Sequence, residues 1–186
     1  MFPLTALMGF LLLSSGALSL PAHAQAPQAL SQPHYEVTLT AYNAVTAQTD
    51  GNPLETASGA FSNPEVVAAR SQDLADELPF GTIIEIDGPT AAQDSCGYSV
   101  VAPVIGYRVI EDTMNARYTD RVDVLLSTEA NYATADKGMK NAAQVLGICN
   151  SVTVRVVGHV GINRLPKTQV ELAAIVGVSN KDLALK

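Results

Sequence analysis

The sequence predicts a mostly β fold, a small closed barrel of six short strands with one or two short helices. Short segments rich in β-branched and other apolar residues recur along the chain, and Gly and Pro separate them. The chain has 186 residues, and about 160 remain after an N-terminal leader, which is enough for a single hydrophobic core. Many short strands around one core favour a barrel over a parallel sheet covered by helices.

Six segments carry the strand signal. In each, β-branched residues alternate with polar ones or cluster over a short run, as strands do. The predicted strands are Glu36–Tyr42, Val66–Arg70, Thr82–Ile86, Tyr107–Glu111, Arg121–Leu126 and Ser151–Val157.

Helix signals are fewer. Ser127 is a good N-cap residue and an acidic turn follows it, which predicts a helix directly after the fifth strand. Thr168–Val176 has helical apolar spacing, and Gly177 is expected to end that helix. A single turn is expected at Ser71–Asp73. A loop of about twenty residues that begins at Asp87 is expected to be functional or tied down.

The N-terminus has the pattern of a secretory signal. Residues 1–24 contain no Asp, Glu, Lys or Arg, are almost continuously apolar from Leu4 to Leu20, and end in a small-residue cleavage pattern. An uncleaved membrane anchor is the alternative, and the polar interruption at Ser14 and Ser15 favours cleavage. The expected organisation is a signal peptide at 1–24, a flexible linker at 25–34, the barrel at 35–160 and a helical extension at 161–186.

Charge and cysteine content indicate which compartment the protein occupies and which classes of partner it can bind. The net charge of −7 lies in the mature part, which argues against a nucleic-acid partner. Two cysteines in an exported chain predict one disulfide, Cys96–Cys149, rather than a catalytic thiol. No clustered histidines accompany them, so neither a metal nor a cofactor is expected. No cysteine lies near residue 24, so a lipid anchor is not expected there. The mature protein is expected to be free in the periplasm or outside the cell.

Asp112 and Asp123 are the strongest candidates for catalysis. Each lies at or near a predicted strand end in apolar surroundings. Burial beside a second carboxylate raises the pKa of a carboxyl group, so that one acid of a pair can stay protonated near neutral pH and act as a general acid. The alternative is that both cap turns or bind backbone amides.

Six segments in order resemble the 3D domain, a family named for three aspartates, over about residues 36–157. The segments are Ala41–Tyr42, Thr49–Gly59, Val67–Asp73, Leu78–Thr82, Val109–Asn115 and Arg121–Val124. The resemblance implies a six-stranded double-psi β-barrel, related to the catalytic barrel of membrane-bound lytic murein transglycosylase A and to the stationary-phase survival transglycosylases.

The resemblance also implies site residues. The three aspartates would be Asp73, Asp112 and Asp123, with Asp76 as an alternative to Asp73 if the alignment slips. Thr56 falls in the segment that lines the sugar cleft in relatives.

Neighbouring residues extend this predicted site. Ser58 offers a second hydroxyl in the Thr56 loop, and Asn115 and Arg117 lie between Asp112 and Asp123. Arg117 is a cation that could hold a carboxylate of muramic acid or of the peptide stem, although exposed arginines are commonly only solvated.

The implied reaction is lytic transglycosylation of peptidoglycan, in which the bond between N-acetylmuramic acid and N-acetylglucosamine is cleaved without water and a 1,6-anhydro ring forms. One carboxyl group can serve as acid and then as base, and Asp123, between two valines, is the favoured one. The alternative is a barrel that binds glycan strands without cutting them. Such surfaces usually present stacked aromatic rings, and this chain has no Trp. A third possibility, a cell-wall scaffold, has no motif behind it.

Overall fold

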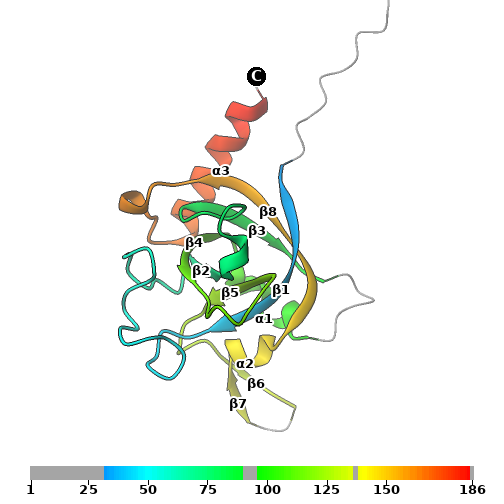
Figure 1. Ribbon diagram of the computed structural model, residues 1–186. Helices are drawn as coiled ribbons and strands as arrows, with labels where there is room; N and C mark the ends of the chain where they lie inside the picture. Colours follow the sequence, from blue (N-terminus) through cyan, green and yellow to red (C-terminus); the bar gives the residue numbers. More distant parts are fainter. Residues whose placement is uncertain (1–31, 90–95, 136–137, 185–186) are drawn as a thin grey trace, which may run out of the picture. The chain divides into compact units, whose positions relative to one another are not determined.

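Six strands close into a barrel in the computed structural model, which describes residues 32–89, 96–135 and 138–184 (Figure 1). All six predicted strands are confirmed, with ends that differ from the predicted ones by at most two residues. Around the barrel their order is β1-β5-β2-β4-β3-β8. The bounds are β1 His34–Tyr42, β2 Val67–Arg70, β3 Thr82–Asp87, β4 Arg108–Thr113, β5 Arg121–Leu125 and β8 Cys149–His159.

The barrel mixes parallel and antiparallel pairs. β1 runs parallel to β5, and β2 runs parallel to β4, whereas the other four neighbouring pairs are antiparallel. Strands that are distant in the sequence therefore lie side by side. In particular, β5 lies between β1 and β2, and β2 lies between β5 and β4.

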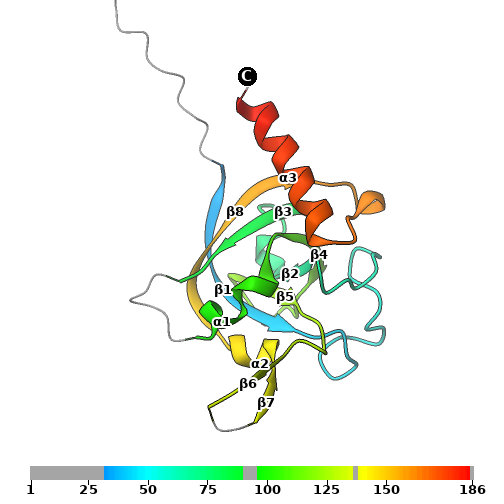
Figure 2. The ribbon, with the colours of Figure 1, turned by 180° about the vertical axis from the view of Figure 1, so that it is seen from behind.

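Alternation along each strand produces two apolar layers. Val122 and Val124 belong to the cluster that all six strands fill inside the barrel, and both are fully buried. Leu125 belongs to a second cluster on the outer side, which Leu172 and Val176 of helix α3 (Gln169–Ala184) complete. Figure 2 shows α3 beside β8. The outer layer is thus also the layer toward which Asp123 is directed.

The two helix predictions had different outcomes. The helix predicted after Ser127 is wrong: the Ser127 hydroxyl accepts the Glu129 amide in a turn, and a hairpin of β6 (Asn131–Ala133) and β7 (Met139–Asn141) follows. N-cap residues also favour turns, and here the turn prevailed.

The C-terminal helix is confirmed, but it continues through Gly177 to Ala184. A glycine inside a helix costs only about 1 kcal/mol, which the burial of Leu172 and Val176 offsets. The turn expected at Ser71–Asp73 is present as η1 (Gln72–Leu74).

The long segment after Asp87 is tied down, as expected, at the described residue Cys96. The Cys96–Cys149 disulfide is present and joins the segment before helix α1 (Tyr98–Ile105) to the first residue of β8. Neither α1 nor the short α2 (Ala142–Leu146) was predicted. None of the helices among the described residues is long and apolar enough to cross a membrane. The predicted signal peptide and nearly all of the linker lie outside the described residues.

Arg108, the first residue of β4, is fully buried and binds only backbone carbonyls. Its Nε donates to Ile105 O at 2.6 Å and its Nη2 to Val104 O at 2.7 Å, at the end of α1. Its Nη1 donates to Pro64 O at 2.7 Å and to Leu125 O at 3.1 Å. Burial lowers the pKa of this guanidinium to about 9, so it stays charged at neutral pH. One cation therefore joins α1, β4, β5 and the loop before β2.

Replacing Arg108 with Met should destabilise the protein by about 4 kcal/mol, because four buried carbonyl bonds lose a charged donor. Chemical denaturation at pH 7 measures this loss. The control is Arg155→Met, which breaks partly exposed ion pairs to Asp87 and Glu85 and should cost less than about 1 kcal/mol. Equal, small losses of stability in the two variants would show that the buried bonds of Arg108 contribute no more than the exposed ion pairs of Arg155.

Candidate active site

Four strands bring the two candidate aspartates to one face of the barrel. Across β1, β5, β2 and β4, the paired residues are Thr40, Asp123, Ala69 and Asp112, in that order. Asp123 and Asp112 are thus both neighbours of Ala69, about 10 Å apart at their Cα atoms by two interstrand spacings. Ala69, which is only 3% exposed, is the strand neighbour that the two aspartates share.

Asp123 is a partly buried carboxyl group with one neutral hydrogen-bond donor. The Thr40 hydroxyl donates to its Oδ1 at 2.7 Å. Burial raises the pKa of Asp123 to about 6, and the negative charge of Asp112 adds to this rise, while Thr40 and Arg121 oppose it. Asp123 therefore holds its proton at a pH two units above that of an ordinary aspartate.

Asp112 has a different environment because three donors bind it. The amides of Ala57 and Thr113 donate to its Oδ1 at 3.0 Å and 2.9 Å, and the Tyr42 hydroxyl donates to its Oδ2 at 2.8 Å. These bonds hold the Asp112 carboxyl group in place as an acceptor. Burial and the charge of Asp112 raise the pKa of Tyr42, which keeps this phenol a permanent donor. One carboxyl group is held as an acceptor, and the other is left without strong donors.

The loop that contains Thr56 and Ser58 covers Asp112. Thr56 is buried, and its hydroxyl is 3.0 Å from the Ser58 hydroxyl and also bonds the backbone of Ala60. The amide of Ser58 donates to the carbonyl of Glu111. Thr56 thus shapes the loop, and Ser58, half-buried, is the more accessible of the two hydroxyls. A role for either in substrate binding stays a prediction.

Glu111 is a second buried carboxyl group beside Asp112, and the sequence did not point to it. It is fully buried, and neither of its oxygens has a hydrogen-bond partner among the described residues. Burial raises its pKa, although the nearby Ser58 hydroxyl, His159 and the Gly81 amide favour the charged form. A β-bulge causes this placement: Ala68 pairs with Ile110 and Ala69 with Asp112, so Glu111 is skipped in the register.

Asp73 lies away from the pair and holds the turn that leads into β5. Its Oδ2 accepts the amide of Asp120 at 2.8 Å, and Asp120 has a positive φ of 51°. Hydrogen bonds from the Ser71 hydroxyl and from the Asp120 amide lower the pKa of the exposed Asp73. The carboxylate of Asp73 therefore fixes where Arg121 and Asp123 begin their strand, and contact with substrate stays a prediction.

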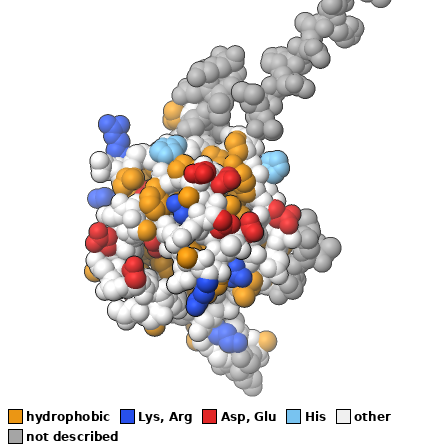
Figure 3. Space-filling model, in the orientation of Figure 1, with side chains coloured by type: hydrophobic (Ala, Val, Ile, Leu, Met, Phe, Trp, Pro, Cys, Tyr) orange, Lys and Arg blue, Asp and Glu red, His pale blue; other side chains and the backbone are white. Residues whose placement is uncertain are grey.

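Asn115 and Arg117 lie in the exposed turn between β4 and β5. The Asn115 side chain accepts the Arg117 amide at 3.1 Å, and its carbonyl accepts the Tyr118 amide. Arg117 and Arg121 both lie over the Tyr118 ring. Acidic and basic side chains lie close together among apolar ones on the face seen in Figure 3.

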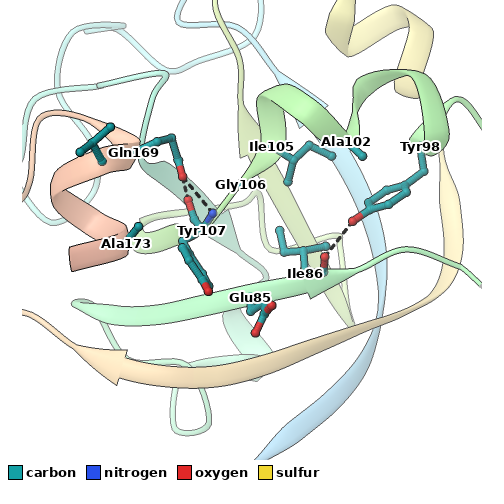
Figure 4. A pocket seen from close by; sticks show the side chains of 10 residues that line it. Glu85, Ile86, Tyr98, Ala102, Ile105, Gly106, Tyr107, Gln169 and Ala173 are labelled. Carbon is teal, nitrogen blue, oxygen red and sulfur yellow. Dashed lines mark hydrogen bonds between the residues drawn. The ribbon is translucent and has the colours of Figure 1, made fainter. Parts of the chain in front are cut away.

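Two hollows in the described surface lie apart from the acid pair. One, of about 410 Å³, lies between α1, β3 and α3 and is lined by Tyr98, Tyr107 and Glu85 (Figure 4). The other, of about 580 Å³, is lined by Ala60 and Phe61 at the far end of the Thr56 loop. Neither is lined by Asp112 or Asp123.

Thr40 and Tyr42 are site residues that sequence reasoning missed. They occupy alternate positions of β1, which directs both toward the outer layer with the aspartates. The sequence does show polar side chains at alternate positions of this strand, but the aspartates that they bind lie 83 and 70 residues away in the sequence. Among the described residues, no group of three or more His, Cys, Asp or Glu could hold a metal ion.

Comparison with known proteins does not name a family: no protein-family model matches the chain, and no curated protein matches its sequence.

Replacing Asp123 with Asn should stabilise the protein at pH 8. A carboxyl group whose folded-state pKa is raised does not destabilise the protein below its unfolded pKa near 4. As the pH rises from there through about 6, the group ionises and the protein loses stability. Asparagine avoids this penalty and keeps an acceptor for Thr40, so the gain should be about 2 kcal/mol at pH 8 and near zero at pH 4. Urea denaturation at both pH values measures it.

Asp112→Asn is the matched comparison. It weakens charge-assisted hydrogen bonds and should cost about 1 kcal/mol at pH 8. A loss of stability in Asp123→Asn at pH 8 would show that the Asp123 carboxylate is well solvated or well paired.

Proposed function

We propose that this protein is a lytic transglycosylase that cleaves peptidoglycan glycan strands between N-acetylmuramic acid and N-acetylglucosamine. The observation that carries the proposal is the pairing of Asp123, whose pKa is raised to about 6, with Asp112, which three donors hold as an acceptor. Two carboxyl groups in different hydrogen-bond environments on one face provide an acid and a partner for it.

In this mechanism Asp123 is the acid and then the base. Protonated Asp123 gives its proton to the glycosidic oxygen as the bond from that oxygen to C1 of muramic acid breaks. The C6 hydroxyl oxygen of the same sugar forms the new bond to C1, and its proton passes to the Asp123 carboxylate. The product carries a 1,6-anhydro ring, no water is consumed, and Asp123 ends in its starting protonation state.

Asp112 has a supporting part in the reaction. Its negative charge raises the pKa of Asp123 and favours the positive charge that develops at C1 in the transition state. Hydrogen bonds from Tyr42, Ala57 and Thr113 fix the Asp112 carboxyl group in place.

The fold and the sequence support the same proposal. The closed six-stranded barrel with two parallel pairs is compatible with a double-psi barrel, the fold that the resemblance to the 3D domain implies. The Cys96–Cys149 disulfide fits an oxidising compartment. We therefore place the protein in the periplasm or outside the cell, where its substrate lies.

One observation favours the non-catalytic alternative. Phe61, at the end of the Thr56 loop, is 66% exposed and borders the hollow of about 580 Å³. Exposed aromatic rings are a common means of holding sugars. A glycan-binding barrel would use this surface and would need no proton transfer.

Mass spectrometry of soluble products tests the proposal. Residues 25–186, incubated with purified peptidoglycan, should release anhydromuropeptides, and Asp123→Asn should reduce release by at least about a thousandfold, because removal of a general acid commonly costs that much. The control Asp50→Asn makes the same chemical change at an exposed loop position and should keep full activity. Products with reducing ends would mean a hydrolase, and co-sedimentation with sacculi without release would mean a glycan-binding protein.

A further inference from the structure

Two guanidinium groups lie against the ring of Tyr118 in the turn between β4 and β5. The Arg117 Cζ is 4.7 Å and the Arg121 Cζ 4.9 Å from the ring centroid. Arg117 Nη2 also donates to the Tyr118 hydroxyl at 2.8 Å. Stacking on a ring orients a guanidinium and leaves most of its five N–H donors pointing outward.

No carboxylate within the described part of the chain forms an ion pair with either guanidinium; the ion pairs recorded there belong to Arg155. The carboxylate of Asp73 accepts the backbone amide of Asp120 in this turn. Two like charges gathered on one ring repel each other, and a bound anion would relieve that repulsion. This arrangement fits an anion supplied from outside the chain.

The position of this cationic pair ties it to the acid pair. Arg121 and Asp123 lie two residues apart on β5, hence on the same side of the strand and about 7 Å apart along it. The charge of Arg121 also lowers the pKa of Asp123, which shows that the two groups interact. An anion bound at Arg121 therefore lies about one sugar ring away from the bond that Asp123 would cleave.

We propose that Arg117 and Arg121, oriented by Tyr118, bind a carboxylate of the peptide stem and so make the protein select glycan that carries peptides over glycan whose lactyl groups are uncharged. This inference rests on the proposed function. Once the peptide is attached, the two sugars of the glycan are uncharged, so carboxylates are found on the stem. Carboxylates match the planar, bidentate donors of arginine.

Binding of that carboxylate would also prepare the acid. It offsets the positive charge of Arg121 and so removes one of the two groups that oppose protonation of Asp123. Peptide recognition and proton transfer are then linked through a single side chain.

The test measures binding in the Asp123→Asn protein, which cannot cleave its ligand. Fluorescence anisotropy would follow a labelled glycan tetrasaccharide with its peptide stems and the same tetrasaccharide with each lactyl group capped as an uncharged amide, because loss of the stems alone would expose a carboxylate on each muramic acid. Adding Arg117→Gln and Arg121→Gln should weaken binding of the peptide-bearing form at least about tenfold and leave binding of the capped form unchanged. Arg164→Gln, at an exposed arginine in η2 (Ile162–Arg164), is the control and should change neither.

The possible outcomes separate the two proposals. Equal weakening of both ligands, or none, overturns peptide recognition and leaves the transglycosylase proposal intact. Binding of neither ligand by the Asp123→Asn protein with both arginines intact overturns the proposed function, and peptide recognition with it.

A pH profile gives a readout that a merely structural role would not move. In the active protein, Arg121→Gln removes the cation that lowers the pKa of Asp123, so the pH above which kcat/KM falls should shift upward. Arg117→Gln should leave that pH unchanged. If the pH above which kcat/KM falls is unchanged in Arg121→Gln, the link between peptide binding and the protonation of Asp123 is overturned.

Discussion

The buried guanidinium of Arg108 is the interaction on which the arrangement of the site depends. Arg108 is the first residue of β4, the strand that carries Glu111 and Asp112, and it binds the end of β5 through the carbonyl of Leu125. Its remaining bonds satisfy carbonyls at the end of α1 and in the loop before β2. A buried cation whose N–H donors lack acceptors is costly. The four carbonyls must therefore reach the Arg108 guanidinium as the strands pack together.

The chemistry of the face follows from an unequal distribution of donors. Asp112 receives two backbone amides and a phenol, whereas Asp123 receives one hydroxyl. The same barrel surface therefore holds one carboxyl group fixed by three donors and another whose pKa burial raises to about 6. The energetic cost of that burial is tolerated because the strands around Asp123 are fixed by fully buried residues on either side of it, Val122 and Val124.

Long-range pairing explains where sequence reasoning was incomplete. The strands were predictable because β-branched runs bounded by Gly and Pro have few alternatives. The turn at Ser127 could not be told from a helix start, since the same hydroxyl serves both, and only the β6–β7 hairpin decides it. The bulge that buries Glu111 also leaves no local pattern, because it is a mismatch between β2 and β4. The contact between the Tyr42 hydroxyl and Asp112 likewise joins residues 70 apart in the sequence.

The sequence by itself determined the six strands, the pairing of Cys96 with Cys149, the C-terminal helix and the two aspartates as candidates, because these depend on local alternation, composition and count. Only the tertiary structure decided that Asp112 and Asp123 flank one alanine, that Asp123 holds its proton more tightly, and that Arg117 and Arg121 share the ring of Tyr118. The reason is physical: a pKa and an ion's partners are set by burial and by charges brought from distant parts of the chain, which no local pattern encodes.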